Sequence, residues 1–250
     1  MKALVTGASS GIGKDIAKYL SDKGYDLIIT ARDKKALEEV AKELKTNVRV
    51  LTFDLAKEEN VFKLYEEVKN EDIDLLVNNA GFGLFGVFNK TDLETELDMI
   101  NVNLKAPHIL TKLFLQDFVK KDKGHILNVA SAAGFLAGPH LNTYYATKNY
   151  TLKLTMAIYQ ELKEQHSNVH ISALCPGPVD TKFNSVAGGA FSIKGLNSKD
   201  VAKYAIDKTL KNKLIIIPGL KTKLAIFGIR FLSYKTQLKI TSKIQMAKNK

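Results

Sequence analysis

A tyrosine and a lysine four residues apart are the first pair in this 250-residue sequence that could carry chemistry. They are Tyr144 and Lys148, in the stretch Tyr-Tyr-Ala-Thr-Lys. On a helix, residues i and i+4 lie on one face. A free phenol has a pKa of about 10, and a neighbouring ammonium favours the phenolate and lowers that pKa. The pair could therefore act as a general acid or base. Tyr145 is the alternative phenol, but it has no lysine at i+4.

Ser131 lies 13 residues before Tyr144, in the stretch Asn-Val-Ala-Ser-Ala-Ala-Gly, where an apolar run ends. Cys175 is the sole cysteine and has no partner motif around it, so we interpret it as a small core residue. The five histidines show no metal-ligand spacing, and we expect no metal.

A glycine-rich turn, Thr-Gly-Ala-Ser-Ser-Gly-Ile-Gly, follows the first apolar run. Glycines let a backbone turn tightly and approach a pyrophosphate, and the N-terminus of the following helix offers free N–H groups. The spacing G-x-x-x-G-x-G differs from the usual G-x-G-x-x-G. The turn predicts a dinucleotide site, and a turn without a ligand is the alternative.

Short apolar runs alternate with helix-length amphipathic runs along the chain. We expect strands at 2–6, 26–30, 48–52, 73–77, 125–130, 170–175 and 214–217, and helices near 12–22, 34–45, 57–69, 92–119, 143–165 and 199–210. This alternation predicts an α/β fold, a Rossmann-like doubly wound parallel sheet of about seven strands with helices on both faces. We expect a single nucleotide-binding domain over 1–250, with 182–197 as a substrate loop and 219–250 as a C-terminal basic amphipathic extension.

The ordered set of motifs from Thr6 to Thr181 resembles the short-chain dehydrogenases/reductases, in their single-domain form of about 250 residues. The resemblance implies hydride transfer between a nicotinamide and a carbonyl or alcohol, with Ser131, Tyr144 and Lys148 as catalytic residues. It also implies that Asn103 links the lysine through water to a proton relay, and we prefer Asn103 to the nearby Asn101. The sequence departs from the family pattern at Ala130, where the family has a first serine.

The same resemblance implies a set of cofactor-binding residues. They are Gly7, Ser9, Ser10, Gly11, Ile12, Gly13, Arg32, Asp54, Leu55, Asn79, Ala80, Gly81, Tyr144, Lys148, Pro176, Gly177, Val179 and Thr181. Asp54 could instead, or in addition, cap the helix predicted near 57–69.

The end of the second predicted strand favours NADP(H) over NAD(H). An acidic residue there would bind the ribose 2′-hydroxyl, whereas an arginine suits a 2′-phosphate. Here Ala31 stands at the strand tip and Arg32 follows it. Arg32 could also be an ordinary surface residue, and we expect Asp33 to cap the helix that begins at residue 34.

The formal net charge of +11 is concentrated in the last quarter of the chain. Residues 1–190 carry 23 basic and 24 acidic side chains, whereas residues 191–250 carry 14 and 2. The apolar run at 224–232 is far too short to span a bilayer, which needs roughly 20 apolar residues. A basic amphipathic segment can lie on a membrane surface, form a lid or form a subunit interface. A solvated helix face is the alternative. Few aromatics and no recognised module accompany it, so we do not expect nucleic-acid binding.

Substrate and location are predicted more coarsely. Apolar residues near the motifs favour an apolar substrate if they face the site; they are Phe82, Leu84, Phe85, Val87, Phe88, Leu136, Phe183, Phe191 and Ile193. The best hypothesis is an NADP(H)-dependent carbonyl (ketone) reductase, and the alternative is a non-catalytic NADP-sensing module on the same fold. The resemblance implies a homodimer or homotetramer. One cysteine and no recognisable signal peptide lead us to expect a cytoplasmic protein.

Overall fold

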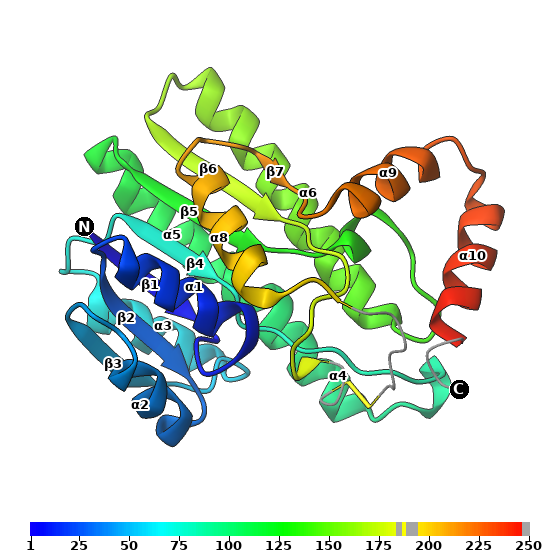
Figure 1. Cartoon of the computed structure of the whole chain (residues 1–250), viewed down its shortest axis with the longest axis horizontal. Helices are drawn as coiled ribbons and strands as arrows, with labels where there is room; N and C mark the ends of the chain where they lie inside the picture. Colours follow the sequence, from blue (N-terminus) through cyan, green and yellow to red (C-terminus); the bar gives the residue numbers. More distant parts are fainter. Residues whose placement is uncertain (184–186, 189–194, 247–250) are drawn as a thin grey trace.

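The computed structural model describes residues 1–183, 187–188 and 195–246, and its centre is a parallel sheet. Its strands are β1 (Lys2–Thr6), β2 (Asp26–Ala31), β3 (Val48–Thr52), β4 (Leu75–Asn78), β5 (Gly124–Val129), β6 (Val169–Leu174) and β7 (Ile215–Ile216). They lie in the order β3-β2-β1-β4-β5-β6-β7, with every neighbouring pair parallel (Figure 1). The order reverses beside β1, and ligands bind at the carboxyl ends of strands at such a point. The predicted sheet is confirmed.

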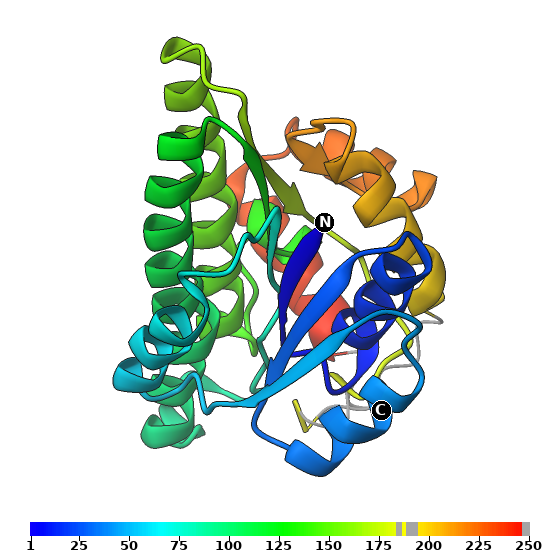
Figure 2. The ribbon, with the colours of Figure 1, turned by 90° about the vertical axis from the view of Figure 1, so that its left-hand side faces the viewer.

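Helices cover both faces of this sheet. The described helices are α1 (Gly11–Asp22), α2 (Lys34–Lys42), α3 (Glu58–Val68), α4 (Leu93–Ile100), α5 (Ala106–Lys121), α6 (Asn142–Glu164), α8 (Ser198–Thr209), α9 (Leu220–Ile229) and α10 (Tyr234–Met246), with the short turns η1 (Phe88–Lys90), η2 (Asn101–Lys105) and η3 (Ala132–Phe135). Figure 2 shows α5 and α6 on one side of the sheet and α1 and α8 on the other.

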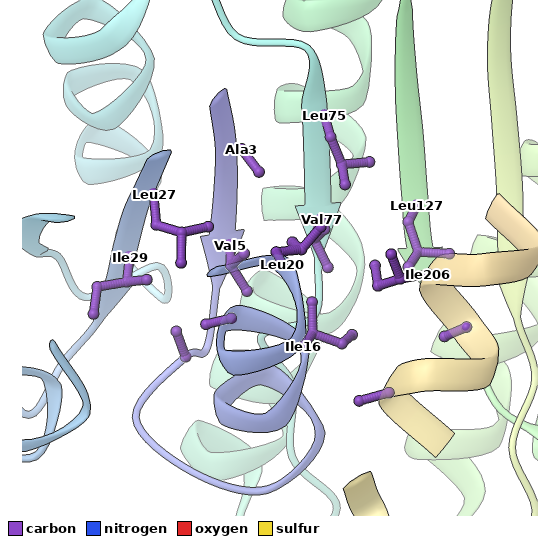
Figure 3. Packing of buried hydrophobic residues seen from close by; sticks show 14 of the residues in the cluster. Ala3, Val5, Ile16, Leu20, Leu27, Ile29, Leu75, Val77, Leu127 and Ile206 are labelled. Carbon is purple, nitrogen blue, oxygen red and sulfur yellow. The ribbon is translucent and has the colours of Figure 1, made fainter. Parts of the chain in front are cut away.

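The strands bury both of their faces, and this explains why they are continuous apolar runs. Ala3 and Val5 of β1 point to one face and lie in the same cluster as Ile16 and Leu20 of α1 (Figure 3). Leu4 points to the opposite face and packs in a second cluster that includes Phe114 of α5. Successive side chains of a strand point to opposite faces, so one strand supplies both cores. The result is a rigid sheet whose carboxyl edge can hold a site.

The run at 92–119, expected as one helix, is interrupted by a wider turn. In η2 the Ala106 N–H donates to the Asn101 carbonyl five residues back, so this turn is a π-helix. Pro107 explains the break, because it has no N–H to donate to the carbonyl of Asn103. That carbonyl accepts a hydrogen bond from the Thr151 hydroxyl at 3.5 Å instead. The interruption places Asn103 against α6.

The basic C-terminal region forms two helices, α9 and α10, that project beyond the layers of the sheet and its covering helices (Figure 1). α9 is apolar on both sides, because Ile226 is buried while Leu224 and Phe227 are exposed. Among the described residues, no helix is long and apolar enough to cross a bilayer.

Candidate active site

The residues singled out in the sequence meet in one pocket of about 460 Å³ at the carboxyl ends of the strands. All of the predicted cofactor and catalytic residues line it except Gly13 and Asn103, which contact its lining. The pocket wall also contains Phe53, Val129, Ala130, Leu141, Pro178, Lys182 and Gln245. The predicted set therefore comes together in space, although it spans most of the chain.

The glycine turn is locked to the end of β4. Gly7 and Gly11 have φ of 65° and 55°, in the left-handed region that favours glycine. A Cβ on Gly13 would lie 2.3 Å from both the Gly7 oxygen and the Asn79 Nδ2. The Asn79 amide donates to the carbonyls of Thr6 and Gly7 at 3.0 and 3.1 Å. No larger residue fits at Gly13 without moving the backbone.

The turn also fits a pyrophosphate. Ser10 is the N-cap of α1, its side chain makes no cap hydrogen bond, and the first turn of α1 contains no acidic residue. The N–H groups and the positive end of the helix dipole therefore remain available to an anion beside Gly11 and Ile12, which line the pocket.

The far end of the pocket carries the arginine predicted to choose the cofactor. Ala31 and Arg32 both line the pocket, Arg32 is exposed, and it forms no ion pair among the described residues. Asp33 accepts a hydrogen bond from the Ala36 N–H at 3.0 Å and caps α2, as expected. The Arg32 guanidinium therefore lies at the tip of β2, while the neighbouring Asp33 carboxylate accepts the hydrogen bond from the Ala36 N–H.

Asp54 lines the pocket but does not cap α3. Its side chain accepts from the Ala56 N–H at 3.1 Å, and Lys57 is the N-cap of α3. The helix-cap alternative for Asp54 is therefore wrong, because the chain makes one further turn before the helix begins. The carboxylate shapes the turn that follows β3.

Helix α6 carries Tyr144 and Lys148, the pair predicted to exchange a proton, and Ser131 follows the end of β5. Lys148 is 5% exposed, and its Nζ donates to the Val129 carbonyl at 2.8 Å. The same Nζ lies 5.8 Å from the centre of the Tyr144 ring. Ser131 begins η3, accepts from the Ala133 N–H at 3.1 Å, and interacts with the Tyr144 phenol. The three side chains share one end of the pocket.

Burial shifts the pKa values of Tyr144 and Lys148 in opposite directions. It raises the pKa of Tyr144 to about 12, although the Ser131 hydroxyl acts to lower it. It lowers the pKa of Lys148 to about 8. The expectation that the ammonium lowers the phenol pKa is not met here, because Nζ bonds to the Val129 carbonyl and lies over the ring. The phenol is therefore protonated at neutral pH.

Asn103 is fixed beside this pair. It is 1% exposed, its Oδ1 accepts from the Phe82 N–H at 3.0 Å, and its Nδ2 donates to the Phe82 carbonyl at 2.8 Å. A Cβ built on Gly81 would lie 2.9 Å from that Oδ1 and 3.4 Å from Lys148 Nζ. Asn103 also donates to the Thr147 hydroxyl of α6 at 3.3 Å, whereas Asn101 is only partly buried. The geometry favours Asn103 over Asn101.

Only part of the predicted apolar wall reaches the pocket. Phe82 and Phe183 line it, and the Phe183 ring centroid lies 5.1 Å from that of Tyr144. The other described members of the set do not line it: Leu84, Phe85, Val87, Phe88 and Leu136. Phe85 stacks on His140 instead, with its N–H bonded to the Ala187 carbonyl, so the loop leaves the pocket after Phe82. Phe191 and Ile193 lie outside the described residues.

Thr6, Phe53 and Gln245 are among the residues of the site that were not found from the sequence. The Thr6 hydroxyl accepts from the N–H groups of Asn79 and Ala80, both at 3.0 Å, and a polar residue ending an apolar strand was a usable signal. Phe53 and Gln245 line the pocket without any local signal. Gln245 reaches the site from α10, a hundred positions beyond its hydrogen-bond partner Tyr145.

Cys175 is fully buried, and burial raises the pKa of its thiol to about 12, which fits a core residue. No cluster of three or more histidine, cysteine or acidic side chains in the described part of the chain is arranged to hold a metal ion.

Comparisons with known proteins agree with this geometry. The family model described as short chain dehydrogenase matches residues 1–188. The chain is 35% identical over 210 residues to an uncharacterized oxidoreductase of Staphylococcus saprophyticus, covering 82% of this chain and 88% of that protein. A short-chain dehydrogenase from Sphingobium yanoikuyae, solved in complex with NADPH, is 27% identical with a TM-score of 0.82, over 92% of this chain and 93% of that chain.

A second solved structure shares the fold. It is a short-chain dehydrogenase/reductase from Burkholderia phymatum in complex with NAD, 22% identical with a TM-score of 0.82, over 90% of this chain and 91% of that chain. The chain therefore belongs to the short-chain dehydrogenase/reductase family and is an oxidoreductase that uses a nicotinamide cofactor.

Proposed function

We propose that this protein is an NADP(H)-dependent carbonyl reductase that acts on ketones. The observation that carries the proposal is the convergence of Ser131, Tyr144 and Lys148 at one end of a pocket whose other end holds the glycine turn and Arg32. A nucleotide lying along this pocket would reach from the arginine to the tyrosine. A module that only sensed NADP would not need the three side chains at the nicotinamide end.

The bound nicotinamide would supply the hydride, which goes to the carbonyl carbon. Tyr144 gives its phenolic proton to the carbonyl oxygen, so that one hydride and one proton convert the ketone to an alcohol. The Ser131 hydroxyl donates a hydrogen bond to the same oxygen as negative charge develops there. Lys148 contributes a buried positive charge beside the phenol. Asn103 holds the backbone of Phe82 and acts as a positioning residue.

The protonation of the tyrosine supports reduction as the favoured direction. A phenol with a pKa of about 12 holds its proton at neutral pH and is ready to donate it. Alcohol oxidation would need the phenolate, which burial disfavours. We therefore propose that the protein reduces carbonyls.

The experiment follows NADPH absorbance while ketones, aldehydes and quinones are offered. We expect turnover by the unmodified protein and a loss of about 100-fold or more in kcat for Tyr144→Phe, because general acid catalysis contributes on this scale. NADPH affinity should stay within about twofold, since the phenyl ring keeps its place. Tyr150→Phe is the matched control: Tyr150 lies on the same helix but bonds to His108. NADPH binding without turnover of any substrate would favour the sensing module.

The choice of NADP(H) rests on Arg32 at the tip of β2. Charge-assisted bonds from a guanidinium to a phosphate contribute most where no other anion competes. We expect Arg32→Ala to weaken NADPH binding by roughly 10- to 100-fold and to leave NADH binding unchanged. Lys34→Ala is the control, because Lys34 is a nearby exposed cation beside Glu38. Equal calorimetric affinities of the unmodified protein for NADPH and NADH would contradict the proposal.

We further propose that α9 and α10 bind the surface of an anionic bilayer. Leu220, Leu224, Phe227 and Phe231 recur at i, i+4, i+7 and i+11 and are all exposed. The charged side chains of residues 220–246 are all basic: Lys221, Lys223, Arg230, Lys235, Lys239 and Lys243. No acidic residue follows Asp207 in the sequence. An exposed apolar stripe on a segment whose charged side chains are all cations matches the interface of an anionic membrane, whereas it would meet like charge on the same segment of a second copy of the chain.

A vesicle assay tests this contact. Sedimentation with phosphatidylcholine–phosphatidylglycerol vesicles should retain the protein, pure phosphatidylcholine should retain much less, and added salt should release it. Exchanging Phe227 and Phe231 for serine should abolish retention, while Phe62→Ser, an exposed phenylalanine of α3, should not. Equal retention of the unmodified protein and the variant with serine at 227 and 231 would overturn the proposal. Self-association of the unmodified protein that is lost only in this variant would also overturn it.

Residues 182–197 remain our candidate for the substrate loop, because Phe183 packs on Tyr144. We propose an assembly of two or four copies, to be measured by light scattering. A cytoplasmic location is proposed because a reducing compartment suits both the thiol of Cys175 and the use of NADPH.

A further inference from the structure

Helix α10 inserts one buried amide into the wall of the active-site pocket. Gln245 is 1% exposed and lines the same pocket as Tyr144 and Phe183. Its Nε2 donates to the Tyr145 hydroxyl at 2.6 Å. This bond joins the C-terminal helix to the helix that carries the proton-exchange pair.

The other end of this amide has no hydrogen-bond partner among the described residues. Gln245 Oε1 is buried and accepts no hydrogen bond from any of the residues that the structure describes. Buried amide oxygens nearly always accept a hydrogen bond, because desolvation without one costs free energy. Gln245 lines the pocket, so a turn of its amide toward the cavity presents this acceptor to a donor carried by the substrate.

The amide is held in place by its neighbours. The Tyr145 ring packs against the backbone of Gly138, where a Cβ would approach ring atoms to 2.3 Å. Tyr144 and Tyr145 are consecutive on α6 and therefore point about 100° apart, with ring centroids 6.1 Å from each other. The phenol that donates the proton and the phenol that holds Gln245 thus belong to different parts of the pocket wall.

We propose that Gln245 is a specificity-determining residue whose Oε1 accepts a hydrogen bond from a hydroxyl or N–H group of the substrate, distant from the carbonyl that is reduced. This rests on the proposed carbonyl reduction at Tyr144. The preferred substrates are then ketones that carry a second, hydrogen-donating group. A pocket that hydrogen-bonds such a group discriminates against analogues that lack it, because the buried oxygen stays unpaired.

Matched pairs of ketones test this assignment. Each pair consists of a methyl ketone ending in a hydroxyl and one of equal chain length ending in a methyl group, over a series of lengths. At one or two lengths the unmodified protein should prefer the hydroxyl-ended ketone by about tenfold in kcat/KM, on the scale of a neutral hydrogen bond. Gln245→Leu should abolish most of that preference through a higher KM for the hydroxyl-ended ketone.

The control is Gln160→Leu, the same exchange at an exposed position of α6, where the amide donates to Glu164. It should leave the preference unchanged. If Gln245 only fastened α10, Gln245→Leu would affect both members of every pair equally. That outcome, or a preference that persists in the variant, would overturn the assignment.

A second variant and a binding measurement cover the other outcomes. Tyr145→Phe keeps the acceptor but releases the amide, so it should lower the preference even if Gln245→Leu does not fold. Unchanged preference in Tyr145→Phe would contradict the proposal. If no ketone is turned over, the proposed reduction fails. Calorimetric titration of the paired ligands into the NADPH complex then tests Gln245 separately, through an affinity difference that the leucine variant should lose.

Discussion

At the residue scale, one physical cause shifts the pKa of both titrating groups of the site, Tyr144 and Lys148. Burial disfavours any charge, so it raises the pKa of the Tyr144 phenol to about 12 and lowers that of the Lys148 ammonium to about 8. Near neutral pH both groups still carry their protons. The pair therefore rests in the state that donates a proton, and only the lysine loses its proton within the range of ordinary assays.

The pH dependence of the reaction follows from these directions. Reduction needs both groups protonated, so its kcat/KM should be flat below about pH 7 and should fall as pH rises through about 8, where Lys148 is neutralised. Alcohol oxidation needs the phenolate and should rise over the same range. Initial rates in both directions across this range test the assignment. Reduction that accelerates from neutral to alkaline pH would contradict it. Lys148→Met should lose the alkaline fall together with most of the activity.

Candidate site residues that form short local patterns could be identified from the sequence. Tyr144 and Lys148 are one helical turn apart, and the glycine turn is contiguous, so each is visible as a short pattern. Gln245 was not visible, because its place depends on how α10 returns to α6. The pKa of Tyr144 was also out of reach, since it depends on the depth of burial and on where Lys148 Nζ finds an acceptor.

At the element scale, the junction of β1 and α1 has no spare volume. We expect Gly13→Ala to lower the melting temperature by about 5–10 °C, since overpacking typically costs about 1–3 kcal/mol and the nearest atoms are partly backbone. NADPH binding should be lost with it.

Gly228→Ala provides the matched control for this prediction. Gly228 lies in α9, and no atom lies within 4 Å of the place that an added methyl group would take, so alanine should leave the melting temperature unchanged or raise it slightly. Calorimetry or circular dichroism gives both values. A Gly13→Ala protein as stable as the Gly228→Ala protein would show that the turn can widen.

The elements themselves were largely predictable, because alternation of apolar strands and amphipathic helices leaves few arrangements for a parallel sheet. The exception was the run at 92–119, where apolar spacing continues across Pro107 and hides the break at η2. Helix ends also moved by a few residues, as α2 ends at Lys42 and not near 45. The spacing of apolar side chains does not show at which residue a helix ends.

At the scale of the whole molecule, the pocket links distant parts of the chain, from Gly7 to Gln245. Ligand binding to the folded state alone should therefore stabilise the entire fold. NADPH at about 100 times its Kd should add about 2.7 kcal/mol, which corresponds to roughly 5–10 °C in melting temperature for a chain of this size. NADH at the same concentration should give a smaller shift. Differential scanning fluorimetry measures both, and identical shifts would remove the argument for a 2′-phosphate site.

The π-turn at η2 has a consequence for how this protein can vary in length. Each residue advances a helix by about 100°, so excising one residue between Asn101 and Lys105 would rotate α5 by about that angle relative to α4. The apolar sides of the two helices could then no longer face the same sheet together. We infer that single-residue deletions, harmless in most surface segments, are not tolerated at this position.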